Sequence, residues 1–415
     1  MKKKIALVVQ RYGLEVNGGA ELHCRLVAEK LCQLYDIEVL TSCAQEYSRW
    51  SNYYKEGVSE INGVVIRRFK VPIERDSKGT RSLRKKIKRI NLSEKILRHL
   101  GLFKYCSRWL SGIRIRYEYG WIKNQGPYLP ELIKYISIHQ ADYDGFIFFT
   151  YLYYPTIYGL QVNPSKSILV PTAHDEEAIY FSIFHRIFQL PKIILFNTES
   201  ERNLVHRLFN NQRVCNFVVG VGIDRPLVHH SIDVRLKFGL TNYDDYFVYV
   251  GRVDEWKGCK ELNEYFLAYR KKRRDNNVKL ILVGQKYMNI MNDGSIIETG
   301  FVEDAVKDAL LRNAKALIIP SRYESLSIVT LESMSLGIPV IAHEQSEVLR
   351  DHIRKSSGGF LYGDYTTFES VLDRVLDDDD LRMEMANKAK AYVEKYYSWD
   401  TVLFKFQNAI TLVTG

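Results

Sequence analysis

The sequence has few cysteines that could cross-link the chain, and it has no apolar run long enough to anchor it in a bilayer. Only six of its 415 residues are cysteine and ten are proline, and no two cysteines form a Cys-x-x-Cys pair. That scatter excludes a disulfide framework and the common zinc motifs. No apolar run reaches the roughly 18 residues of a membrane-spanning helix, and Ile5–Val9 is too short for a signal-peptide core. We therefore expect a cytoplasmic protein.

What the chain does have is an ordinary globular composition. Hydrophobic residues make up 46% of it and charged residues 26%, which argues against a disordered or collagen-like chain. At roughly 100–200 residues per domain, the length predicts two to four domains.

Positive charge is concentrated in one segment. The formal net charge is +10, yet segment 67–116 alone contains 17 Lys and Arg against three acidic residues, so the rest of the chain is mildly acidic. In this segment apolar side chains alternate with Lys85, Lys86, Lys88 and Arg89. The mixture suits a surface helix whose apolar face packs on the domain and whose basic face meets solvent, an anionic membrane or an anionic acceptor. Nucleic acid is not expected as a partner, because no RNP-like, helix-turn-helix or zinc-finger pattern accompanies the charge.

Short, wholly apolar runs recur along both halves of the chain, and segments with helical periodicity follow them. Such strands are covered by helices on both faces, so the pattern predicts parallel sheets. We expect an α/β protein with two doubly wound, Rossmann-like domains. The expected strands are Ile5–Val9, Ile37–Leu40, Phe146–Phe149, Ile168–Val170, Ile193–Phe196, Asn216–Val219, Phe247–Val250, Leu280–Val283, Ala316–Ile319 and Pro339–Ala342.

The boundary between the two domains is expected near Val219–Asp224, where two glycines follow a strand-like run. Glycines there permit the backbone rotation of a hinge, although an ordinary strand-to-loop turn would look the same. The expected domains are a first Rossmann-like domain at 1–222 with a basic insertion at about 77–120, a second at 223–395, and a C-terminal helix at 396–415 that packs back on the first domain. The apolar side of that helix would contain Val402, Phe404, Phe406 and Ile410.

The richest motif runs from Pro320 to Glu332, after an expected strand and at the start of an expected helix. Glu324 and Glu332 are eight residues apart, or about 2.2 turns, so both carboxylates are expected near one helical face. The amides between them, at the helix start, form an anion-binding end, and the carboxylates would accept hydrogen bonds from hydroxyls attached to the bound phosphates. A capped surface helix with two solvated glutamates is the alternative. The amides belong to Ser325, Leu326, Ser327 and Ile328.

A basic motif stands at the carboxyl end of the expected strand 247–250, where open α/β sheets bind their ligands. Arg252 offers a bidentate fork for phosphate oxygens and Lys257 a compact point charge. Facing a leaving nucleoside diphosphate, these cations would stabilise the transition state. The alternative is that they only pair with Asp254 and Glu255.

Two motifs of the first half also follow expected strands. Gly18 and Gly19 let the backbone approach a phosphate at a helix start, although such glycines often form only a turn. His174 follows strand 168–170 and could orient a sugar hydroxyl or bind its phosphate, whereas a structural histidine fits equally well. No GxGxxG, HExxH, EF-hand or Walker A sequence is present, which weighs against a dinucleotide-dependent oxidoreductase.

Together these motifs resemble those of the retaining glycosyltransferases of family 4, whose GT-B fold has two Rossmann-like domains facing a cleft. The resemblance covers nearly the whole chain apart from about residues 77–120. In the second half it rests on Gly251-Arg252, Lys257-Gly258, Gly300-Phe301-Val302, Pro320-Ser321, Glu324 with seven residues to Glu332, Gly337-Ile338-Pro339-Val340 and Gly358-Gly359-Phe360-Leu361. In the first half it rests on Gly18-Gly19-Ala20-Glu21, Trp50-Ser51-Asn52, Gln125-Gly126-Pro127 and Pro171-Thr172-Ala173-His174-Asp175-Glu176.

The resemblance implies transfer of a hexose-type sugar from a nucleoside-diphosphate sugar, UDP before GDP, to a glycan, glycolipid or glycoprotein. The anomeric configuration would be retained by front-face attack, with no metal or other cofactor. Arg252 and Lys257 would hold the diphosphate, Glu332 the ribose and Glu324 the hydroxyls of the sugar, while His174 lines the acceptor side. The other donor-binding positions would be Gly18, Gly19, Gly251, Phe301, Val302, Ser325, Leu326, Ser327 and Ile328.

Two positions depart from the family pattern. The common Gly-Phe-Gly after the first glutamate is Ser325-Leu326-Ser327 here, which keeps the amides and adds hydroxyls. A histidine that many relatives carry after the fourth strand is absent from Phe149–Tyr154, where tyrosines stand instead. Acceptor contacts can therefore not be transferred from the family.

Other functions of the same fold are a nucleotide-sugar epimerase and a phosphorylase, and a non-catalytic partner of another transferase is a third alternative. An epimerase needs a base and an acid at the sugar, and a phosphorylase needs a pyridoxal lysine; neither has a clear candidate. The intact set of Arg252, Lys257, Glu324 and Glu332 argues against lost activity.

Overall fold

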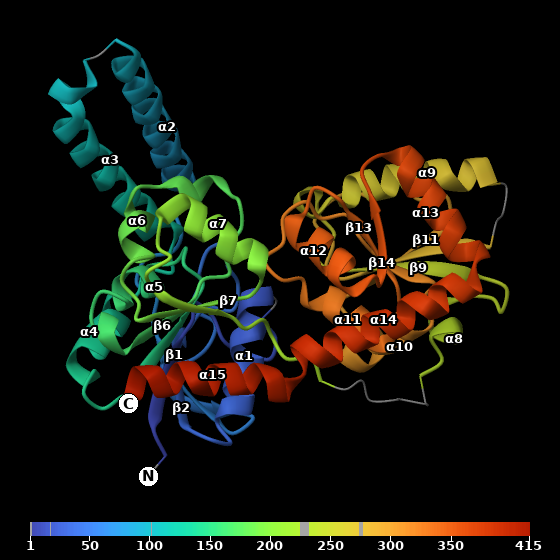
Figure 1. Cartoon of the computed structure of the whole chain (residues 1–415), viewed down its shortest axis with the longest axis horizontal. Coiled ribbons are helices and arrows are strands. Elements are labelled where there is room, and N and C mark those ends of the chain that lie inside the picture. Colours follow the sequence, from blue (N-terminus) through green and yellow to red (C-terminus); the bar gives the residue numbers. More distant parts are fainter. Residues whose placement is uncertain (1, 17, 101, 225–231, 274–276) are drawn as a thin grey trace. The chain divides into compact units, whose positions relative to one another are not determined.

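The computed structural model describes residues 2–16, 18–100, 102–224, 232–273 and 277–415. By its backbone contacts the chain divides into two compact units, Met1–Gly220 with Leu403–Gly415, and Val221–Val402. Each unit has its own sheet with helices packed against it (Figure 1). The predicted fold class is confirmed.

The first unit is built on an eight-stranded sheet with the order β3-β4-β2-β1-β5-β6-β7-β8. All neighbouring strands are parallel except β3, which is antiparallel to β4. The edge strand β3 was missed in the sequence because its middle residues are exposed and it lacks an apolar run. The strands are β1 (Lys4–Val8), β2 (Asp36–Ser42), β3 (Gly57–Ile61), β4 (Val64–Phe69), β5 (Gly145–Phe149), β6 (Ser167–Val170), β7 (Ile193–Phe196) and β8 (Cys215–Val218).

The helices of the first unit cover this sheet on both faces, which is why the central strands are apolar throughout. They are α1 (Gly19–Leu31), α2 (Ser77–His99), α3 (Phe103–Gln125), α4 (Pro130–His139), α5 (Tyr154–Gly159), α6 (Ile183–Ile187) and α7 (Glu199–Phe209), with short 3-10 turns at η1 (Pro164–Lys166) and η2 (Glu177–Tyr180). The core between helices and sheet contains large aromatic side chains, among them Trp50, Trp121, Phe146 and Phe148.

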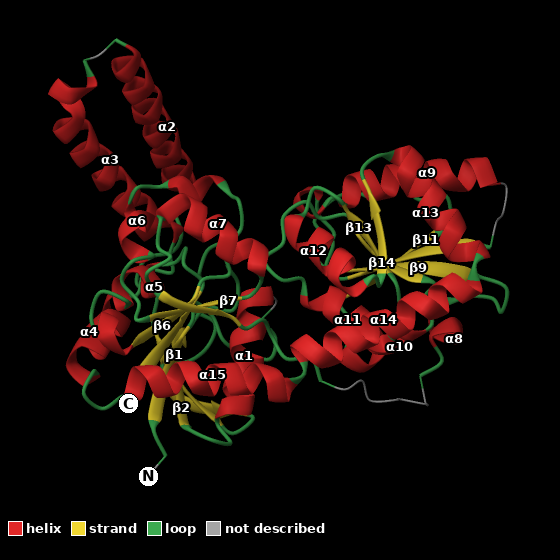
Figure 2. Ribbon diagram, in the orientation of Figure 1, coloured by secondary structure: helices red, strands yellow, loops and turns green. Residues whose placement is uncertain are grey.

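The basic insertion is a pair of adjoining helices, α2 and α3, that run side by side away from the sheet (Figure 2). Sequence reasoning expected one surface helix with its apolar face on the domain, and this is wrong for the outer part of the segment. Ile87 is buried, but Leu92, Ile96, Leu100, Leu102 and Trp109 are all exposed. The reason is that each outer half-helix has the other helix as its neighbour and lies beyond the reach of the sheet.

The second unit has a six-stranded parallel sheet with the order β11-β10-β9-β12-β13-β14. Its strands are β9 (Asp245–Val250), β10 (Val278–Val283), β11 (Ile296–Gly300), β12 (Ala316–Ile319), β13 (Val340–His343) and β14 (Gly359–Tyr362). Its helices are α8 (Val234–Phe238), η3 (Glu255–Lys257), α9 (Cys259–Arg273), α10 (Asp304–Arg312), α11 (Ile328–Leu336), α12 (Glu347–Ser356), α13 (Tyr365–Asp377) and α14 (Asp379–Tyr397).

The last helix, α15 (Trp399–Thr414), carries the chain from the second unit back to the first. Val402, Phe406 and Ile410 are buried as expected, whereas Phe404 is 63% exposed. The expectation for Phe404 was therefore wrong, because two residues along a helix turn a side chain to the opposite face.

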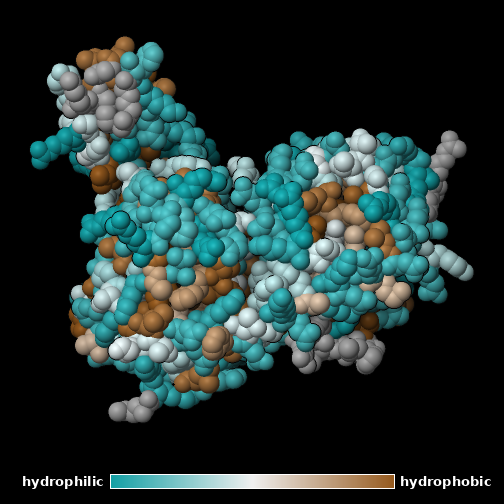
Figure 3. Space-filling model, viewed as in Figure 1, coloured by the Kyte–Doolittle hydropathy of each residue, from teal (hydrophilic) through white to brown (hydrophobic). Residues whose placement is uncertain are grey.

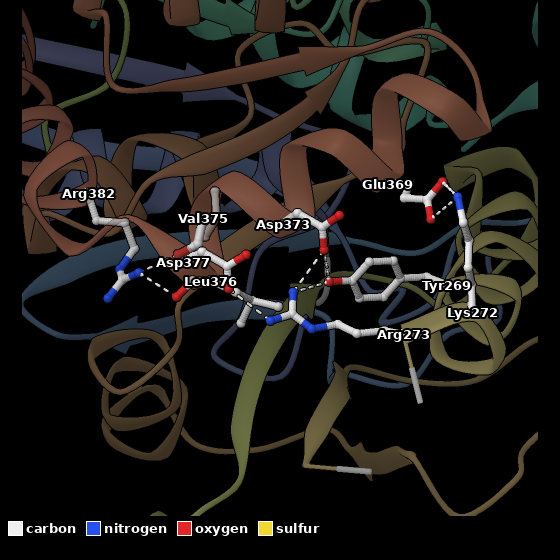
Figure 4. Close-up of polar contacts among 9 residues, drawn as sticks. All are labelled: Tyr269, Lys272, Arg273, Glu369, Asp373, Val375, Leu376, Asp377 and Arg382. Atoms are coloured by element: carbon white, nitrogen blue, oxygen red, sulfur yellow. Dashed lines mark hydrogen bonds and ion pairs between the residues drawn. The ribbon is translucent and has the colours of Figure 1, made fainter. Parts of the chain in front are cut away.

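Helix α9 is fixed to α13 by side chains at its carboxyl end (Figure 4). The Arg273 guanidinium donates to Asp373 and to Asp377, each at 2.8 Å, and the Tyr269 hydroxyl donates to Asp373 at 2.7 Å. Lys272 pairs with Glu369 beside them. These contacts hold the helix whose amino end directly follows the basic motif.

Candidate active site

The two motifs of the second half lie at the switch point of its sheet. From the central strand β9 the chain passes to β10 on one side, while β12 pairs with β9 on the other side. Ligands of open α/β sheets bind at such a point, outside the carboxyl ends of the strands. The loop after β9 holds Arg252 and Lys257, and the loop after β12 runs from Pro320 to Ser327.

Glycine brings these two loops close together. Gly258, in the left-handed region with φ of +79°, lies so near the Pro320 carbonyl that a Cβ atom would stand 2.4 Å from its oxygen. Asp254 caps the short turn η3 by accepting from the Lys257 amide at 2.8 Å. The Tyr249 hydroxyl donates to the Arg252 carbonyl at 2.6 Å. Contacts from β9 and from the loop after β12 thus fix the backbone of the basic loop.

The cations of the basic loop differ in their partners. Lys257 Nζ lies 2.7 Å from Glu324 Oε1, so the side chains of the two motifs meet directly. Arg252 Nη2 lies 3.5 Å from Asp254 Oδ2 within its own loop. Arg252 therefore has a neighbouring acid as one of its partners, while Lys257 reaches across to the second motif.

Helix α11 begins at Ile328, three residues later than the motif suggested. Glu324 to Ser327 are not helical, and Ser327 has a left-handed φ of +61°. The expectation that Glu324 and Glu332 share a helical face was wrong, because helical spacing does not apply across this loop. Across the described ranges no hydrogen-bond partner takes the amides of Ser325 to Ile328, which leaves four donors for an anion.

A buried histidine supports this loop, and nothing in the sequence marked it. His352 on α12 lies with Nε2 at 2.9 Å from the Leu326 carbonyl and Nδ1 at 3.0 Å from the Tyr392 hydroxyl. Burial lowers the pKa of His352 to about 4, so the imidazole is neutral. Because a carbonyl only accepts, Nε2 carries the proton and donates to Leu326, while Tyr392 donates to Nδ1.

Glu332 has a cation of its own. Lys307 on α10 lies 3.0 Å from the Glu332 carboxylate and 3.1 Å from Asp304. Burial raises the pKa of Glu332, and the Lys307 ammonium works against that shift. Sequence reasoning missed Lys307; the only signal was its place in the helix that follows the Gly300-Phe301-Val302 turn. The two glutamates of the motif are thus each paired with a different lysine.

Phe301 and Val302 follow β11, two strands away from β9. Phe301 is 69% exposed and Val302 half-buried. The Gly284 amide donates to the Gly300 carbonyl at 2.8 Å, which ties this turn to the end of β10. An exposed ring at that edge offers a surface on which a base can stack.

In the first unit, Gly18 and Gly19 play different parts. Gly18 precedes α1, and a Cβ there would meet the Glu21 carboxylate at 2.2 Å and the Arg11 guanidinium at 3.1 Å. Arg11 and Glu21 form a buried ion pair at 2.6 Å, so Gly18 makes room for that pair. A Cβ on Gly19 would meet nothing within 4 Å, which leaves Gly19 open to approach.

His174 stands after β6 in a turn that a buried glutamate holds. The Ala173 amide donates to Glu201 Oε1 at 2.5 Å and the Asn197 amide to Glu201 Oε2 at 2.6 Å. Burial raises the pKa of Glu201 to about 8, against the effect of these backbone donors. His174 itself lies 3.9 Å from Glu176.

Glu176 also accepts from the Tyr151 hydroxyl at 2.7 Å. Tyr151 belongs to the tyrosine segment that stands where many relatives have a histidine. Sequence reasoning named His174 and missed the partners Glu201 and Tyr151, because they come from other elements. Of the helices described, none is both long and apolar enough to cross a membrane.

Comparison with known proteins agrees with this architecture. Residues 233–392 match the family model described as glycosyl transferases group 1. An uncharacterized glycosyltransferase of Methanocaldococcus jannaschii is 25% identical, over 96% of this chain and 95% of that protein. A D-inositol 3-phosphate glycosyltransferase of Jonesia denitrificans is also 25% identical, over 50% of this chain and 54% of that protein.

Solved structures share the fold across both units. Anabaena HepE in complex with UDP-glucose gives a TM-score of 0.69 at 14% identity, covering 98% of this chain and 99% of that one. Sucrose-phosphate synthase of Thermosynechococcus elongatus gives 0.68 at 15% identity, covering 98% of both chains. The class of protein is therefore a two-unit α/β protein with the GT-B fold. Residues 233–392 carry the group 1 glycosyl transferase domain, and the chain is a glycosyltransferase that uses a nucleotide-sugar donor.

Proposed function

We propose that this enzyme transfers a hexose-type sugar from a UDP-sugar to a glycan, glycolipid or glycoprotein acceptor with retention of anomeric configuration. The observation that carries the proposal is the 2.7 Å contact between Lys257 and Glu324 at the switch point. Beside it lie the amides of Ser325 to Ile328, which have no partner among the described residues. Cations, amides and a carboxylate at one edge match the three parts of a nucleotide sugar: diphosphate, sugar hydroxyls and ribose.

The donor would bind to the second unit. Its diphosphate lies between the basic loop and the amides after Glu324, where Arg252 and Lys257 balance its charge. Lys257 joins the phosphate region to Glu324, which accepts from the sugar hydroxyls. Glu332, held by Lys307, accepts from the ribose. The base stacks near Phe301 and Val302, and Gly251 leaves room beside the phosphates.

The chemistry needs no protein nucleophile. The bond between the anomeric carbon and the β-phosphate oxygen breaks, and an acceptor oxygen bonds to that carbon from the same face. The proton of the acceptor hydroxyl passes to the leaving phosphate oxygen, so UDP and the glycosylated product are the only products. Arg252, Lys257 and the amides stabilise the negative charge that develops on the leaving diphosphate.

The acceptor would bind to the first unit, where Gly19 is open and His174 stands after β6. Glu201 holds the backbone beside His174 and so positions the imidazole. UDP is preferred to GDP because the solved relative HepE carries UDP and UDP-glucose in its structures. Side-chain cations supply the charge that a metal would otherwise supply, so we expect chelation by EDTA to leave turnover unchanged.

The proposal is tested by thermal-shift measurements with UDP, GDP, ADP and their common sugars, because binding to the native state raises its midpoint. The preferred donor is then incubated without acceptor, and slow release of one nucleoside diphosphate is expected. Lys257→Ala should abolish the shift and the release. Lys272→Ala is the matched control, since Lys272 also pairs with a glutamate at 2.8 Å but on α9 and α13, away from the switch point (Figure 4). A preference for GDP, or equal behaviour of the two variants, would contradict the proposal.

A further inference from the structure

The inner half of the helix pair α2–α3 is built into the first unit. Ile87, Trp121 and Ile122 are buried in the core of the unit. Glu118 on α3 accepts from the Ser182 amide at 2.9 Å and the Ile183 amide at 3.0 Å. This half is therefore a rigid base.

Between the base and the outer half lies an ion pair. Glu94 on α2 and Arg114 on α3 meet at 2.7 Å, and the Glu94 side chain is almost fully buried. This ion pair neutralises Glu94, the one acidic residue in the sequence from 85 to 109, a stretch that contains eight Lys and Arg. The charge that the outer half presents to its surroundings is consequently positive.

From the level of that ion pair outward, both helices carry an exposed apolar stripe. On α2 the stripe is Leu92, Ile96 and Leu100, spaced by four residues, and each side chain is at least half exposed. Across the end of the pair and along α3 it continues with Leu102, Tyr105 and Trp109, of which Trp109 is 69% exposed. Helical spacing of this kind normally faces a core. Figure 3 shows apolar surface at the outer end of the pair, next to hydrophilic surface.

We propose that the outer half of α2–α3 docks on an anionic lipid bilayer, with the apolar stripes in the acyl boundary and the flanking cations at the headgroups. Charge complementarity selects this occupant: exposed cations such as Lys95 and Arg108 beside exposed apolar side chains match an anionic surface over an apolar interior. Exposed tryptophan and tyrosine suit the headgroup level, because one part of each ring system is apolar and another is polar. The proposal is independent of the donor and of the reaction catalysed.

Docking is measured by flotation of the full chain with vesicles of phosphatidylcholine, with and without one quarter phosphatidylglycerol. We expect binding to the mixed vesicles that weakens as salt rises, since exposed charges are screened. Replacing Lys95 and Arg108, two exposed cations of the outer half, by glutamine should weaken it about thirtyfold at low ionic strength. Leu100→Ser with Trp109→Ser should weaken it at high and low salt alike.

The matched control is Leu236→Ser with Phe404→Ser, which removes two equally exposed apolar side chains outside the helix pair and should leave binding unchanged. Trp109→Phe should keep binding but lose the blue shift of tryptophan fluorescence on vesicle addition. Circular dichroism spectra and the thermal midpoints of the unliganded variants should match those of the wild type and show that all of them are folded.

Three outcomes would overturn the proposal. The first is a wild-type chain that does not float with the mixed vesicles, and the second is a double serine variant that floats as well as the wild type. The third is a concentration-dependent dimer, seen by light scattering, that the double serine variant dissolves while vesicle binding is absent. In that case the stripes belong to an interface between two copies of the chain.

Discussion

Lys257 and Glu324 meet because two loops are already close through Gly258, so the contact of the side chains follows from the backbone. Arg252 lies in the same loop but pairs locally with Asp254. A single loop thus offers one cation held by the second motif and one held by its own turn. We therefore expect different effects from replacing Arg252 and from replacing Lys257.

Arg252→Ala should lower kcat/KM by about 100-fold to 1,000-fold, by analogy with the loss of one donor to a developing oxyanion. The physical reason is that the charge on the leaving diphosphate grows in the transition state. Steady-state kinetics with the preferred donor measures the effect. Arg354→Ala, an exposed arginine on α12, is the control, and near-normal turnover of Arg252→Ala would refute the role.

Glu332→Gln should weaken nucleotide binding by about tenfold to a hundredfold, because a hydrogen bond to a charged acceptor is lost and Lys307 is left without its carboxylate. Isothermal titration calorimetry with UDP measures the change. Glu369→Gln, which removes a lysine-paired glutamate on α13, should bind UDP like the wild type. Unchanged affinity of Glu332→Gln would remove the ribose assignment.

At the scale of elements, the amino end of α11 is held by a helix that follows it in the chain. His352 on α12 donates to the carbonyl of Leu326 and so fixes the loop that offers the amides. The alternation of strands and helices is determined by local apolar periodicity, and sequence reasoning predicted it well. It placed the start of α11 too early, because the left-handed Ser327 and the support from His352 leave no periodic signal.

His352→Gln should make the free energy of unfolding less dependent on pH between about 4 and 6.5. The native pKa of His352 is about 4, below the ordinary value of 6.5, so between these values the unfolded chain binds more protons and the native state loses stability as pH falls. The contribution is on the order of 3 kcal/mol, present above pH 6.5 and lost toward pH 4. Urea denaturation at several pH values measures it.

The control is His23→Gln in the first unit, since burial also lowers the pKa of His23 to about 4. It should flatten the same pH dependence without changing UDP binding. His352→Gln should flatten the pH dependence and also weaken UDP binding, because it loosens the Leu326 loop. Equal UDP affinity in the two variants would contradict a positioning role for His352.

At the scale of the whole molecule, the chain starts and ends in the same unit. Helix α15 returns from the second unit, and its residues from Leu403 onward complete the core of the first unit. Phe406 packs edge-on against the ring of His23, and the Lys405 ammonium donates to the Val218 carbonyl at 3.0 Å. The core of the first unit therefore includes side chains of α15.

Phe406→Ala should destabilise the first unit by about 3–5 kcal/mol, because it empties a fully buried site. Phe404→Ala, two residues earlier on the same helix and exposed, should change stability by less than about 0.5 kcal/mol. Urea unfolding followed by circular dichroism compares them. A similar effect of both substitutions would mean that α15 does not pack as described.

The sequence by itself determined the two parallel sheets and the strand ends at which Arg252, Lys257, Glu324 and His174 stand. Apolar runs and their spacing are local properties that survive without tertiary contacts. Only the tertiary structure decided the partners: Lys307 for Glu332, Glu201 and Tyr151 around His174, and His352 under Leu326. It also decided that the outer half of α2–α3 keeps its apolar stripes exposed. Periodicity tells which face of a helix is apolar, whereas only the folded chain determines whether anything lies against that face.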